Sequence, residues 1–435
     1  MKRYDTYTES GISWIGKIPS HWEVLPFGRH FTYGKGLPIT KSDLASEGIP
    51  VISYGQIHAK YNTGTSISDE MVRKVSSAYL KSNPQSLLQT NDFVFADTSE
   101  DIDGAGNFAF NDRKDFIFAG YHTLIARPFG LKVPKYYAYL FGSTVWRRTT
   151  QSLVNGVKVY SISKRVLKQS SLLVPPQEEQ EAIVAYLDEK CAQIDRYVAS
   201  LEERIERLGE LRQALIAEAV TRGINPQAPL RPSGIPWLGE IPQHWEIKKV
   251  RSLFSERREK VSDKEWEPLS VSKDGVTLQL ESAVKTDNGD NRKKVCKGDF
   301  VVNSRSDRKG ACGFSVYDGS VSLINIVLFT KKDVEIESSF YHFLFRSNDY
   351  IEEYYRNGRG IVADLWTTRF TEMRNILLPV PPQAEQEAIV AYLDEKTTQI
   401  DRYTGQLEEM IRQMRDLRQT IISEAVTGKI CVLPN

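Results

Sequence analysis

Two blocks of sequence occur twice in this chain, and they divide it into repeated and unrepeated parts. The segment from Ser10 to Glu23 (SGISWIGKIPSHWE) returns at Ser233 to Glu246 with ten of fourteen positions identical. A block of fifty residues, from Pro175 to Ile224, returns at Pro381 to Ile430 with thirty-three identities. The segments between the blocks show no obvious alignment. A long internal repeat constrains domain boundaries more firmly than local propensity does.

The two blocks repeat at different offsets. The first recurs after 223 residues and the second after 206, so the first unrepeated segment is 17 residues longer than the second. A duplicated enzyme is expected to keep its catalytic motifs in both copies. A duplicated recognition protein is expected to diverge in the parts that recognise, and the pattern therefore favours a protein with two different binding domains.

The second repeated block predicts two long helices. Pro175 and Pro176 are well placed to precede a helix, and the apolar positions that follow have helical spacing. These positions alternate steps of four and three, which is the seam of a coiled coil. In the first copy they are Leu187, Cys191, Ile194, Val198, Leu201, Ile205 and Leu208, and in the second copy they are Leu393, Thr397, Ile400, Thr404, Leu407, Ile411 and Met414.

In both copies the next apolar residue, Leu211 or Leu417, comes after only three positions. This spacing predicts a stammer that overwinds the supercoil locally. The first helix, from Glu178 to Thr221, would span roughly 65 Å at about 1.5 Å per residue. Since one helix leads away from the first domain and the other leads back, we expect an antiparallel pair. We also expect the two domains at opposite ends of the pair, and chain ends that nearly meet.

Both unrepeated segments predict a domain of about 150 residues that mixes helix and strand. Short β-rich runs include GIPVISYG, NDFVFAD, KGDFVVNS, GFSVYDG and SLINIVLF, and aromatic-rich helical runs include PKYYAYLFGSTVWRRTTQ and SSFYHFLFRSNDYIEEYYR. The predicted fold class is α+β, with two twisted-sheet domains and two long antiparallel coiled-coil helices in a pseudo-two-fold arrangement. The predicted boundaries are 1–174 and 233–380 for the domains, 175–222 and 381–428 for the helices, 223–232 for a linker and 429–435 for a tail.

The net charge of +1 conceals an uneven distribution of charge. Together the two fifty-residue blocks hold 12 basic and 20 acidic residues, which leaves 45 basic and 36 acidic residues elsewhere. Residues 1–174 alone hold 21 basic and 14 acidic residues. A basic surplus favours contact with phosphate backbones, whereas acidic helices are better suited to protein contacts.

Candidate nucleic-acid contacts lie in loops that combine Gly with Arg, Lys, Asn, Gln or aromatic residues. Such side chains can reach phosphates and base edges, with Arg and Lys preferring guanine and Asn and Gln preferring adenine. One such loop is usually an ordinary solvated surface, so the argument depends on their occurrence in both domains. The candidates in the first domain are Lys35, Lys41, Tyr54, Gln56, His58, Lys60, Asn155, Lys158 and Tyr160. Those in the second are Arg257, Lys273, Arg305, Arg308, Lys309, Arg356, Arg359 and Arg369.

No catalytic or metal-binding residue is predicted. Both Pro-Pro pairs follow Val and precede Gln, unlike an amino-methyltransferase motif, and no phosphate-binding GxxxxGK[ST] loop occurs. The four cysteines form no CxxC pair. The duplicated His-Trp pairs at 21–22 and 244–245 are expected to pack the domains on the helices. No export signal or membrane segment is evident, so the sequence predicts a cytoplasmic protein.

Over its whole length the chain resembles the specificity subunits of type I restriction-modification enzymes. The resemblance rests on the PPxxEQEAIVAYLDEKxxQID helices, the SGIxWxGxIPxHWE openings and the EGIPVISYGQI stretch. It rests also on the pre-helix segments NGVKVYSISKRVLKQSSLLVPP and GRGIVADLWTTRFTEMRNILLPVPP. It implies a sequence-specific DNA-binding subunit without catalytic activity. Each domain would read one half of a split target in the major groove, and the helix pair would fix the unread spacer.

The resemblance also implies partner proteins. Two modification (methyltransferase) subunits would dock on the helices and carry S-adenosylmethionine, and restriction/translocase subunits would bring ATP and Mg²⁺. No cofactor is expected on this chain. Base-reading residues vary within the family, so none is transferred. Ile361 to Leu365 stands in the second copy where the first has Gly156 to Tyr160, and Arg356, Arg359 or Arg369 is expected to replace contacts made there.

Two other functions stay open on sequence grounds. A protein scaffold with two binding heads on a coiled-coil rod would show no affinity for duplex DNA and no salt dependence. A self-sufficient methylase or nuclease would be active as a purified chain, and the missing motifs argue against it.

Overall fold

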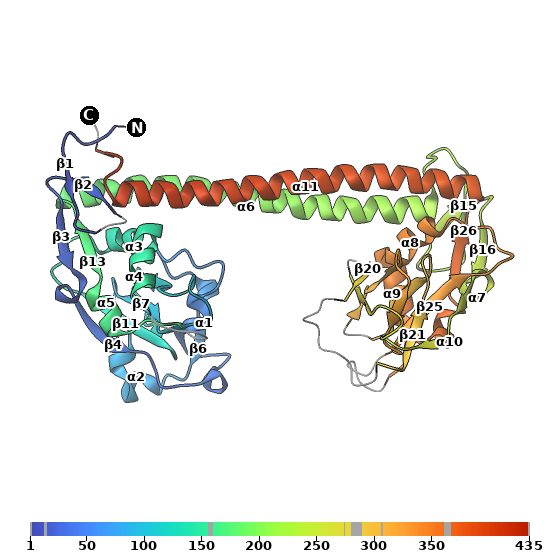
Figure 1. Ribbon diagram of the computed structural model, residues 1–435, viewed down its shortest axis with the longest axis horizontal. Helices are drawn as coiled ribbons and strands as arrows, with labels where there is room; N and C mark the ends of the chain where they lie inside the picture. Colours follow the sequence, from blue (N-terminus) through green and yellow to red (C-terminus); the bar gives the residue numbers. More distant parts are fainter. Residues whose placement is uncertain are drawn as a thin grey trace. The chain divides into compact units, whose positions relative to one another are not determined.

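The computed structural model describes residues 2–12, 15–154, 160–273, 275–279, 289–305, 308–360 and 367–433. The chain forms two compact units (Figure 1). Unit 1 comprises residues 1–200 and 409–435, and unit 2 comprises residues 201–408. Each unit therefore contains one unrepeated segment together with a part of each long helix.

The two predicted long helices are present as α6 (Gln177–Arg222) and α11 (Gln383–Val426). In unit 1 the end of α11 lies beside the start of α6, because Gly428 packs against Trp22, whose Nε1 donates to Glu179 at 2.9 Å. In unit 2 the end of α6 lies beside the start of α11, because Gly223 packs against Trp245 and Glu385. The helices are therefore antiparallel within each unit, as predicted.

The predicted stammer is wrong. Leu211 is 48% exposed and Leu417 is 42% exposed, so neither residue occupies the seam between the helices. The step of four continues instead to Arg212 and Arg418. The Nε of Arg418 lies 3.0 Å from Asp195 in unit 1, and the Nε of Arg212 lies 3.6 Å from Asp401 in unit 2. A long arginine stem can fill a seam position while its charge meets a carboxylate on the facing helix.

The other predicted seam positions are at least partly buried. Fully buried positions in α6 are Leu187, Cys191, Ile194, Val198 and Leu201, and those in α11 are Leu393, Thr397, Ile400 and Ile411. Half-buried positions are Ile205, Leu208, Thr404, Leu407 and Met414. The heptad pattern therefore predicted the packed face of each helix correctly up to Leu208 and Met414.

The core of unit 1 is an antiparallel sheet in the order β4-β11-β7-β9. Its strands are Phe31–Lys35, Thr123–Pro128, Phe93–Ala96 and Phe108–Phe110. A second sheet has the order β10-β5-β6, from Phe118–Ala119, Ile49–Ile52 and Arg73–Val75. Short pairs join β1 (Tyr7–Glu9) to β2 (Lys17–Pro19), β8 (Thr98–Ser99) to β12 (Tyr160–Ser161), and β3 (Glu23–Pro26) to β13 (Ser171–Val174). The short helices are α1 (Tyr54–Ile57), α2 (Tyr79–Ser82) and α5 (Lys164–Gln169).

Unit 2 repeats the four-stranded sheet of this core, whereas its three-stranded sheet is antiparallel throughout its described strands and lacks there the parallel pair β10–β5 of unit 1. Its sheet β17-β25-β22-β23 is formed by Phe254–Glu256, Asn325–Thr330, Phe300–Asn303 and Cys312–Phe314. The sheet β18-β21-β24 is formed by Lys260–Val261, Arg292–Val295 and Gly319–Val321. Pairs join β14 (Leu230–Pro232) to β15 (Glu240–Pro242), β16 (Glu246–Lys249) to β26 (Leu377–Val380), and β19 (Leu269–Ser272) to β20 (Gly275–Leu278). The short helices are α7 (Val250–Leu253) and α10 (Phe370–Met373).

Each aromatic-rich run forms two helices rather than one. In unit 1 they are α3 (Pro134–Gly142) and α4 (Thr144–Ser152), and in unit 2 they are α8 (Ser338–Arg346) and α9 (Asn348–Arg356). Ser143 and Ser347 separate them, because each serine hydroxyl accepts the backbone N–H three residues later and caps the second helix. Ser143 and Ser347 are therefore equivalent positions.

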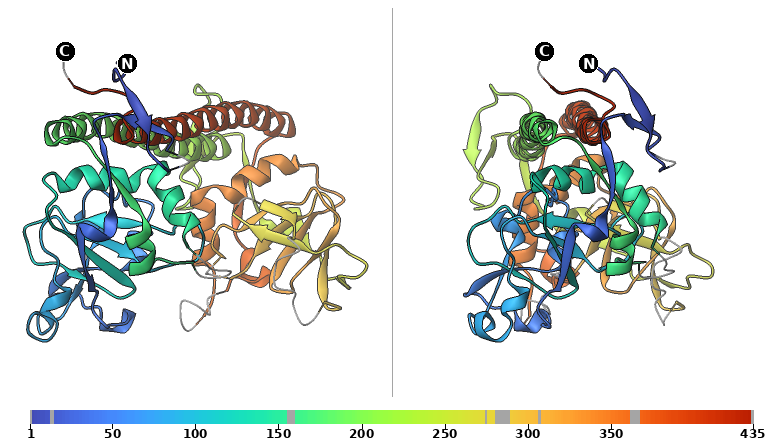
Figure 2. Two further views of the ribbon diagram at one scale, coloured as in Figure 1. Left: turned by 60° about the vertical axis from the view of Figure 1, so that its left-hand side comes forward. Right: turned by 90° about the vertical axis from the view of Figure 1, so that its left-hand side faces the viewer.

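In unit 1, α3 lies between α6 and the main sheet (Figure 2). Toward α6, the hydroxyl of Tyr139 donates to Asp188 at 2.6 Å and Lys135 pairs with the same carboxylate at 2.8 Å. Toward the sheet, the ring of Phe141 lies 5.0 Å from that of Phe93. The long helix is consequently part of the packing of the globular domain.

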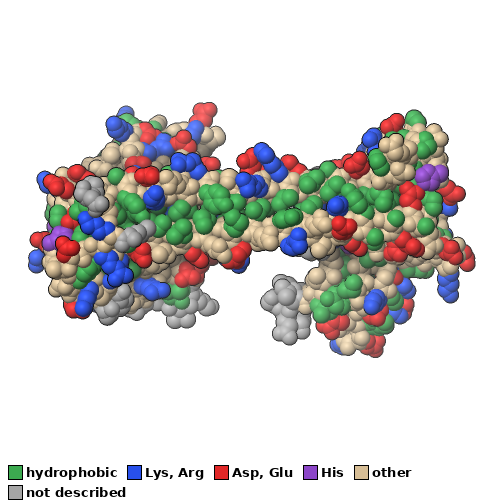
Figure 3. All heavy atoms as spheres, turned by 90° about the horizontal axis from the view of Figure 1, so that it is seen from above, with side chains coloured by type: hydrophobic (Ala, Val, Ile, Leu, Met, Phe, Trp, Pro, Cys, Tyr) green, Lys and Arg blue, Asp and Glu red, His purple; other side chains and the backbone are tan. Residues whose placement is uncertain are grey.

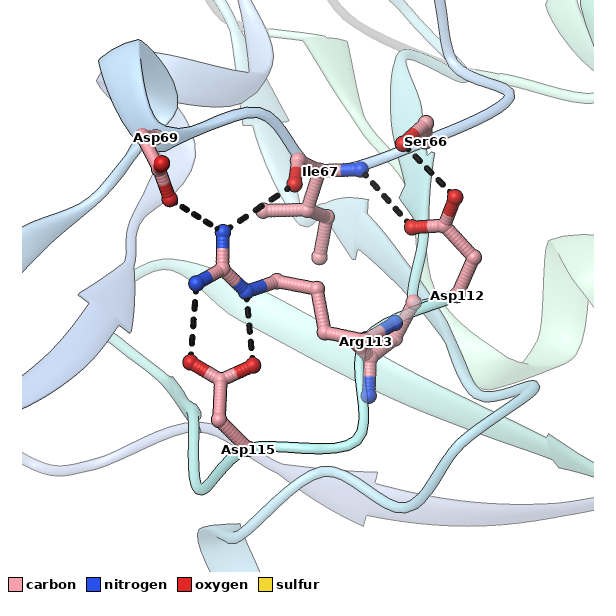
Figure 4. A network of polar contacts seen from close by, with 7 residues as sticks. Ser66, Ile67, Asp69, Asp112, Arg113 and Asp115 are labelled. Carbon is pink, nitrogen blue, oxygen red and sulfur yellow. Dashed lines mark hydrogen bonds and ion pairs between the residues drawn. The ribbon is translucent and has the colours of Figure 1, made fainter.

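A polar network fixes a surface loop of unit 1 (Figure 4). The guanidinium of Arg113 donates two hydrogen bonds of 2.8 Å to Asp115 and one of 2.6 Å to Asp69. Next to it, Ser66 donates to Asp112 at 2.8 Å. The network holds the segment after α1 against the connection between β9 and β10.

The repeated opening segments make the same contact with the long helices. His21 lies 2.6 Å from Glu179 in unit 1, and His244 lies 2.7 Å from Glu385 in unit 2. These contacts confirm the prediction that the His-Trp pairs pack the domains on the helices. The segment 223–232, predicted as a linker, ends in β14, which is the repeat of β1. The chain ends meet within unit 1, where the N–H of Cys431 donates to the carbonyl of Lys2 at 2.9 Å.

Among the described residues, no helix combines the length and the apolar character that a membrane span requires.

Candidate nucleic-acid interface

The same end of the main sheet carries irregular loops in both units. In unit 1, β4 and β7 end where β11 begins, with Lys35 opposite Leu124 and Ala96 opposite Thr123. In unit 2, β22 ends where β25 begins, with Asn303 opposite Asn325. We call the loops at this end, together with the residues that line the cavity among them, the sheet-end surface of each unit.

The sheet-end surface of unit 1 encloses an open cavity of about 700 Å³. Two predicted contacts, Tyr54 and His58, line it together with His122. The ring of Tyr54 lies 5.3 Å from that of His122 and 5.5 Å from that of Tyr121. A third candidate, Tyr160, lies opposite Ser99 of the cavity wall in the β12–β8 pair. The structure therefore brings Tyr160 close to Tyr54 and His58, which lie about a hundred residues earlier in the sequence.

A chain of hydrogen bonds fixes His58 within this cavity. Its Nε2 lies 2.8 Å from the carbonyl of Thr98, and its Nδ1 lies 2.9 Å from the amide nitrogen of Asn107. A carbonyl can only accept and an amide nitrogen can only donate, so Nε2 is the donor of this pair and Nδ1 the acceptor. Arg147 completes the chain by donating to Oδ1 of Asn107 at 2.7 Å, and burial lowers the pKa of Arg147. Both ring nitrogens of His58 are thus engaged within the protein.

The cavity of unit 1 offers mainly hydrogen-bond acceptors. The carboxylates of Glu100, Asp101 and Asp103 line it, and Asp97 lies 3.4 Å from His122 at its rim. His122 has a left-handed backbone conformation (φ 53°) that turns its side chain out of β11, and the side chain is 57% exposed. Acceptors of this kind suit the exocyclic amino groups of bases better than phosphates.

The other candidates of unit 1 lie on neighbouring loops. Lys35 is exposed at the end of β4, Lys41 is exposed in a 3₁₀ turn, and Lys60 is exposed after α1. Gln56 instead caps α1, because its Oε1 accepts the N–H of Ser53 at 3.1 Å. Two further candidates, Asn155 and Lys158, lie outside the described residues.

The sheet-end surface of unit 2 encloses a cavity of about 610 Å³ with a different lining. The predicted contact Arg369 lines it together with Arg258, Lys260 and Lys293, whereas Glu256 supplies the one carboxylate among its lining residues. Arg305 and Arg359, which were also predicted, both form β-bridges with Thr367 of the same lining. Unit 2 therefore presents hydrogen-bond donors where unit 1 presents acceptors.

The backbone shows which residues of the two surfaces correspond. The N–H of Ile162 donates to Asp97 at 2.9 Å, and the N–H of Thr368 donates to Ser304 at 3.2 Å. Ile162 and Thr368 are 206 positions apart, which is the offset of the long helices. The alignment of Tyr160 with Leu365 was therefore wrong by one residue, because the same offset pairs Tyr160 with Trp366, which lies outside the described residues.

Several candidates of unit 2 are engaged elsewhere in the structure. Arg257 donates to both oxygens of the buried Asp299, at 2.7 and 2.9 Å, and this contact raises the pKa of Arg257. Arg356 pairs with Glu353 on its own helix. Arg308 is exposed at the end of its loop. Lys273 and Lys309 line another cavity of unit 2.

Several residues of the two surfaces were not among the candidates, including His122, Arg258, Lys260, Lys293 and the carboxylates Glu100, Asp101 and Asp103. Arg258 and Lys260 lie in the basic run Glu256 to Lys260, from which only Arg257 was selected. Lys293 likewise lies in a run of basic residues, which could have indicated it as a candidate. Nothing in the sequence identified His122, which lies in a left-handed conformation in the short turn between β10 and β11.

The long helices carry exposed apolar side chains (Figure 3). In unit 1, Tyr197 of α6 is 39% exposed and Leu417 of α11 is 42% exposed. The repeat gives unit 2 the equivalent residues Tyr403 and Leu211, which are 51% and 48% exposed. Each unit therefore presents the same apolar pair on its long helices.

Comparison with known proteins agrees with this architecture. Residues 19–207 match the family model described as "Type I restriction modification DNA specificity domain". The chain is 22% identical over 438 residues to the EcoKI specificity subunit of Escherichia coli K12, an alignment that covers 95% of this chain and 90% of that protein. It is also 22% identical over 439 residues, with the same coverage, to the StySPI specificity subunit of Salmonella potsdam.

A solved structure has the same fold. It was described in a study of complex assembly and conformational transition of the type I restriction-modification system. The two structures superpose with a TM-score of 0.62 at 15% sequence identity, over 95% of this chain and 99% of that one. The duplicated α+β domains and the long helices are thus a fold that this chain shares with that structure. Over nearly its whole length the chain is similar to type I restriction-modification specificity subunits.

Proposed function

We propose that this chain recognises a bipartite DNA target, each unit reading one half of it through its sheet-end surface. The observation that carries the proposal is the contrast between two equivalent surfaces on one backbone frame. Unit 1 presents Tyr54, His122 and a group of carboxylates, whereas unit 2 presents arginines and lysines. A common frame with different reading groups is what the recognition of two unlike half-sites requires.

The chemistry of each surface suggests the bases that it reads. Carboxylates accept hydrogen bonds from the amino group of cytosine, and arginine donates to the O6 and N7 of guanine. We infer that unit 1 reads a half-site through exposed amino groups and that Arg305, Arg359 or Arg369 reads guanine for unit 2. Exposed cations such as Lys35 and Lys60 are assigned to phosphates, which position the protein without reading sequence.

Duplex binding tests this function directly. Titration of the full-length chain, alone and assembled with its modification subunits, against duplex DNA at two salt concentrations should give an affinity that falls as salt rises. The alternative, a scaffold that binds only proteins, predicts no affinity and no salt dependence. Absence of duplex binding in both preparations would therefore favour the scaffold over a DNA-recognition subunit.

The long helices are assigned to protein docking and to spacing. The acidic surplus of the two repeated blocks disfavours phosphate contact, and the apolar pairs Tyr197–Leu417 and Leu211–Tyr403 favour a protein partner. The partners proposed are two modification subunits, which carry S-adenosylmethionine, and restriction/translocase subunits, which use ATP and Mg²⁺. This chain then acts in the cytoplasm as a subunit without catalytic residues of its own.

The spacing role has its own test. Insertion of four residues, about one helical turn, into both long helices should lengthen the unread spacer of the target and leave both half-sites unchanged. Insertion between Asp195 and Arg212 in α6, and between Asp401 and Arg418 in α11, leaves the residues of both ion pairs intact. An unchanged spacer after this insertion would refute the spacing role.

A further inference from the structure

Unit 2 contains a second basic cavity, distinct from the cavity of its sheet-end surface. Its volume is about 360 Å³, and it lies between α6, the helices α8 and α9, and the loops that follow β19 and β22. Four cations line it, together with one carboxylate, that of Glu352. The cations are Arg212 of α6, Lys273 and Lys309 of the loops, and Arg346 at the end of α8.

The protein neutralises these charges only in part. Lys309 pairs with Glu352 at 2.5 Å and lies over the ring of Tyr355, 4.7 Å from its centroid. Arg346 donates to the carbonyl of Lys273, which is a neutral partner. Arg212 approaches Asp401 only to 3.6 Å. Among the described lining residues, the cavity therefore keeps a surplus of positive charge that can attract an anion.

A histidine in the wall does not contribute to this charge. Burial, together with the positive charges of Arg346 and Arg212, lowers the pKa of His342 to about 4. His342 is therefore neutral at physiological pH. The positive charge of the cavity comes from guanidinium and ammonium groups.

The equivalent place in unit 1 is built differently. The correspondence of Ser143 with Ser347 puts Gly142 where unit 2 has Arg346, and Tyr139 where unit 2 has Phe343. Tyr139 and Lys135 both bind Asp188 of α6, and Arg418 lies 3.0 Å from its own carboxylate partner. In unit 1 the charges of Lys135 and Arg418 are therefore each met by an aspartate, and Gly142 supplies no counterpart to the cation of Arg346.

We propose that the cavity lined by Arg212, Lys273, Lys309 and Arg346 binds a backbone phosphate of the DNA duplex. The proposal rests on the proposed DNA-binding function and extends it to a contact made by a long helix. Guanidinium and ammonium groups on three sides match the acceptor oxygens of a phosphodiester. Because Arg212 belongs to α6, such a contact would fix the helix as well as the domain on the DNA.

Duplexes of random sequence are a sufficient probe, because a phosphate contact carries no base specificity. Binding is measured over a series of salt concentrations for the wild type, Arg346→Gln and Lys273→Gln, each in the full-length chain assembled with its modification subunits. Lys332→Gln is the matched control, since it removes an exposed cation beyond the opposite end of β25. Thermal unfolding checks that each variant is folded. Lys273 is itself exposed, so its variant keeps the test valid if Arg346→Gln folds poorly.

We expect each cavity variant to reduce the steepness of log affinity against log salt concentration by about one. Each variant should also lower the affinity for random duplexes and for target duplexes by the same factor. The control should keep the wild-type slope. Wild-type slopes in both cavity variants would refute the phosphate site while leaving the proposed function intact. A loss of assembly with the modification subunits, with unchanged DNA binding, would refute it in favour of an acidic protein partner. If the wild type itself binds no duplex, the proposed function fails first.

Discussion

The ion pair between Arg257 and Asp299 predicts a large loss of stability when the arginine is removed. The carboxylate of Asp299 is 4% exposed, and it accepts two hydrogen bonds from Arg257 and one from the N–H of Cys296. Breaking a buried pair costs about 3–5 kcal/mol, because one charge stays buried without its partner. Arg257 is 23% exposed and the N–H of Cys296 stays in place, so we expect about 2–4 kcal/mol for Arg257→Ala.

Urea unfolding followed by circular dichroism measures this loss. With a slope of about 2 kcal/mol per molar urea, the midpoint of the unit 2 transition should fall by about 1–2 M. Arg258→Ala is the control, because Arg258 is 72% exposed and its pair with Glu256 should contribute less than about 1 kcal/mol. The double variant Arg257→Met with Asp299→Asn removes both charges and should recover most of the lost stability.

The opposite pattern would refute this reasoning. If Arg257→Ala unfolds at the wild-type urea concentration and weakens DNA binding more than Arg258→Ala does, Arg257 is a DNA contact and not a structural residue. The sequence alone predicted that contact, so the experiment also decides between the sequence interpretation and the structural one.

Three further predictions concern stability. Glu179→Ala should destabilise unit 1 more than Glu385→Ala destabilises unit 2, by about 1–3 kcal/mol in urea unfolding. The reason is that Glu179 accepts three side-chain hydrogen bonds whereas Glu385 accepts one. Equal losses of stability would contradict this. The pKa of His342 is about 4, below its unfolded value of about 6.5, so protons favour the unfolded state as pH falls from 6.5 toward 4. The free energy of unfolding of unit 2 should fall by about 2 kcal/mol between pH 7 and pH 5. The variant His342→Phe should remove that part of the pH dependence, as measured by urea unfolding at the two pH values. Ser143→Ala should cost about 0.5–2 kcal/mol through loss of the α4 cap, measured by thermal unfolding, and no change would mean that the cap is dispensable.

Much of the frame was predictable because its signals are local in sequence. The repeat and the heptad spacing identified both long helices, their antiparallel order and most of their packed positions. The prediction of a stammer was wrong because the heptad spacing was read from apolar residues only. The seam at Arg212 and Arg418 is continued by arginine stems whose charges meet aspartates on the other helix, and a pattern of hydrophobic residues cannot reveal such a pair.

The candidate site was predictable only in part. Tyr160 converges on the cavity of Tyr54 and His58, although nothing in the sequence indicated that it would meet them. Arg257 has the loop chemistry of a DNA contact, but its partner Asp299 lies 42 residues away in the sequence. His122 was missed because its exposure depends on a left-handed turn at the start of β11. Long-range partners and backbone conformation, rather than residue type, decided these outcomes.

The central claim is that each unit reads its own half of the target, and a map of methylated adenines in host DNA tests it most directly. The map is compared between cells that contain the wild-type chain and cells that contain the triple variant Arg305→Ala, Arg359→Ala and Arg369→Ala. We expect a bipartite motif in the wild type. In the variant, one half-site should become relaxed while the other half-site and the spacer stay unchanged. Simultaneous loss of specificity in both half-sites, with the variant folded and assembled, would contradict the account.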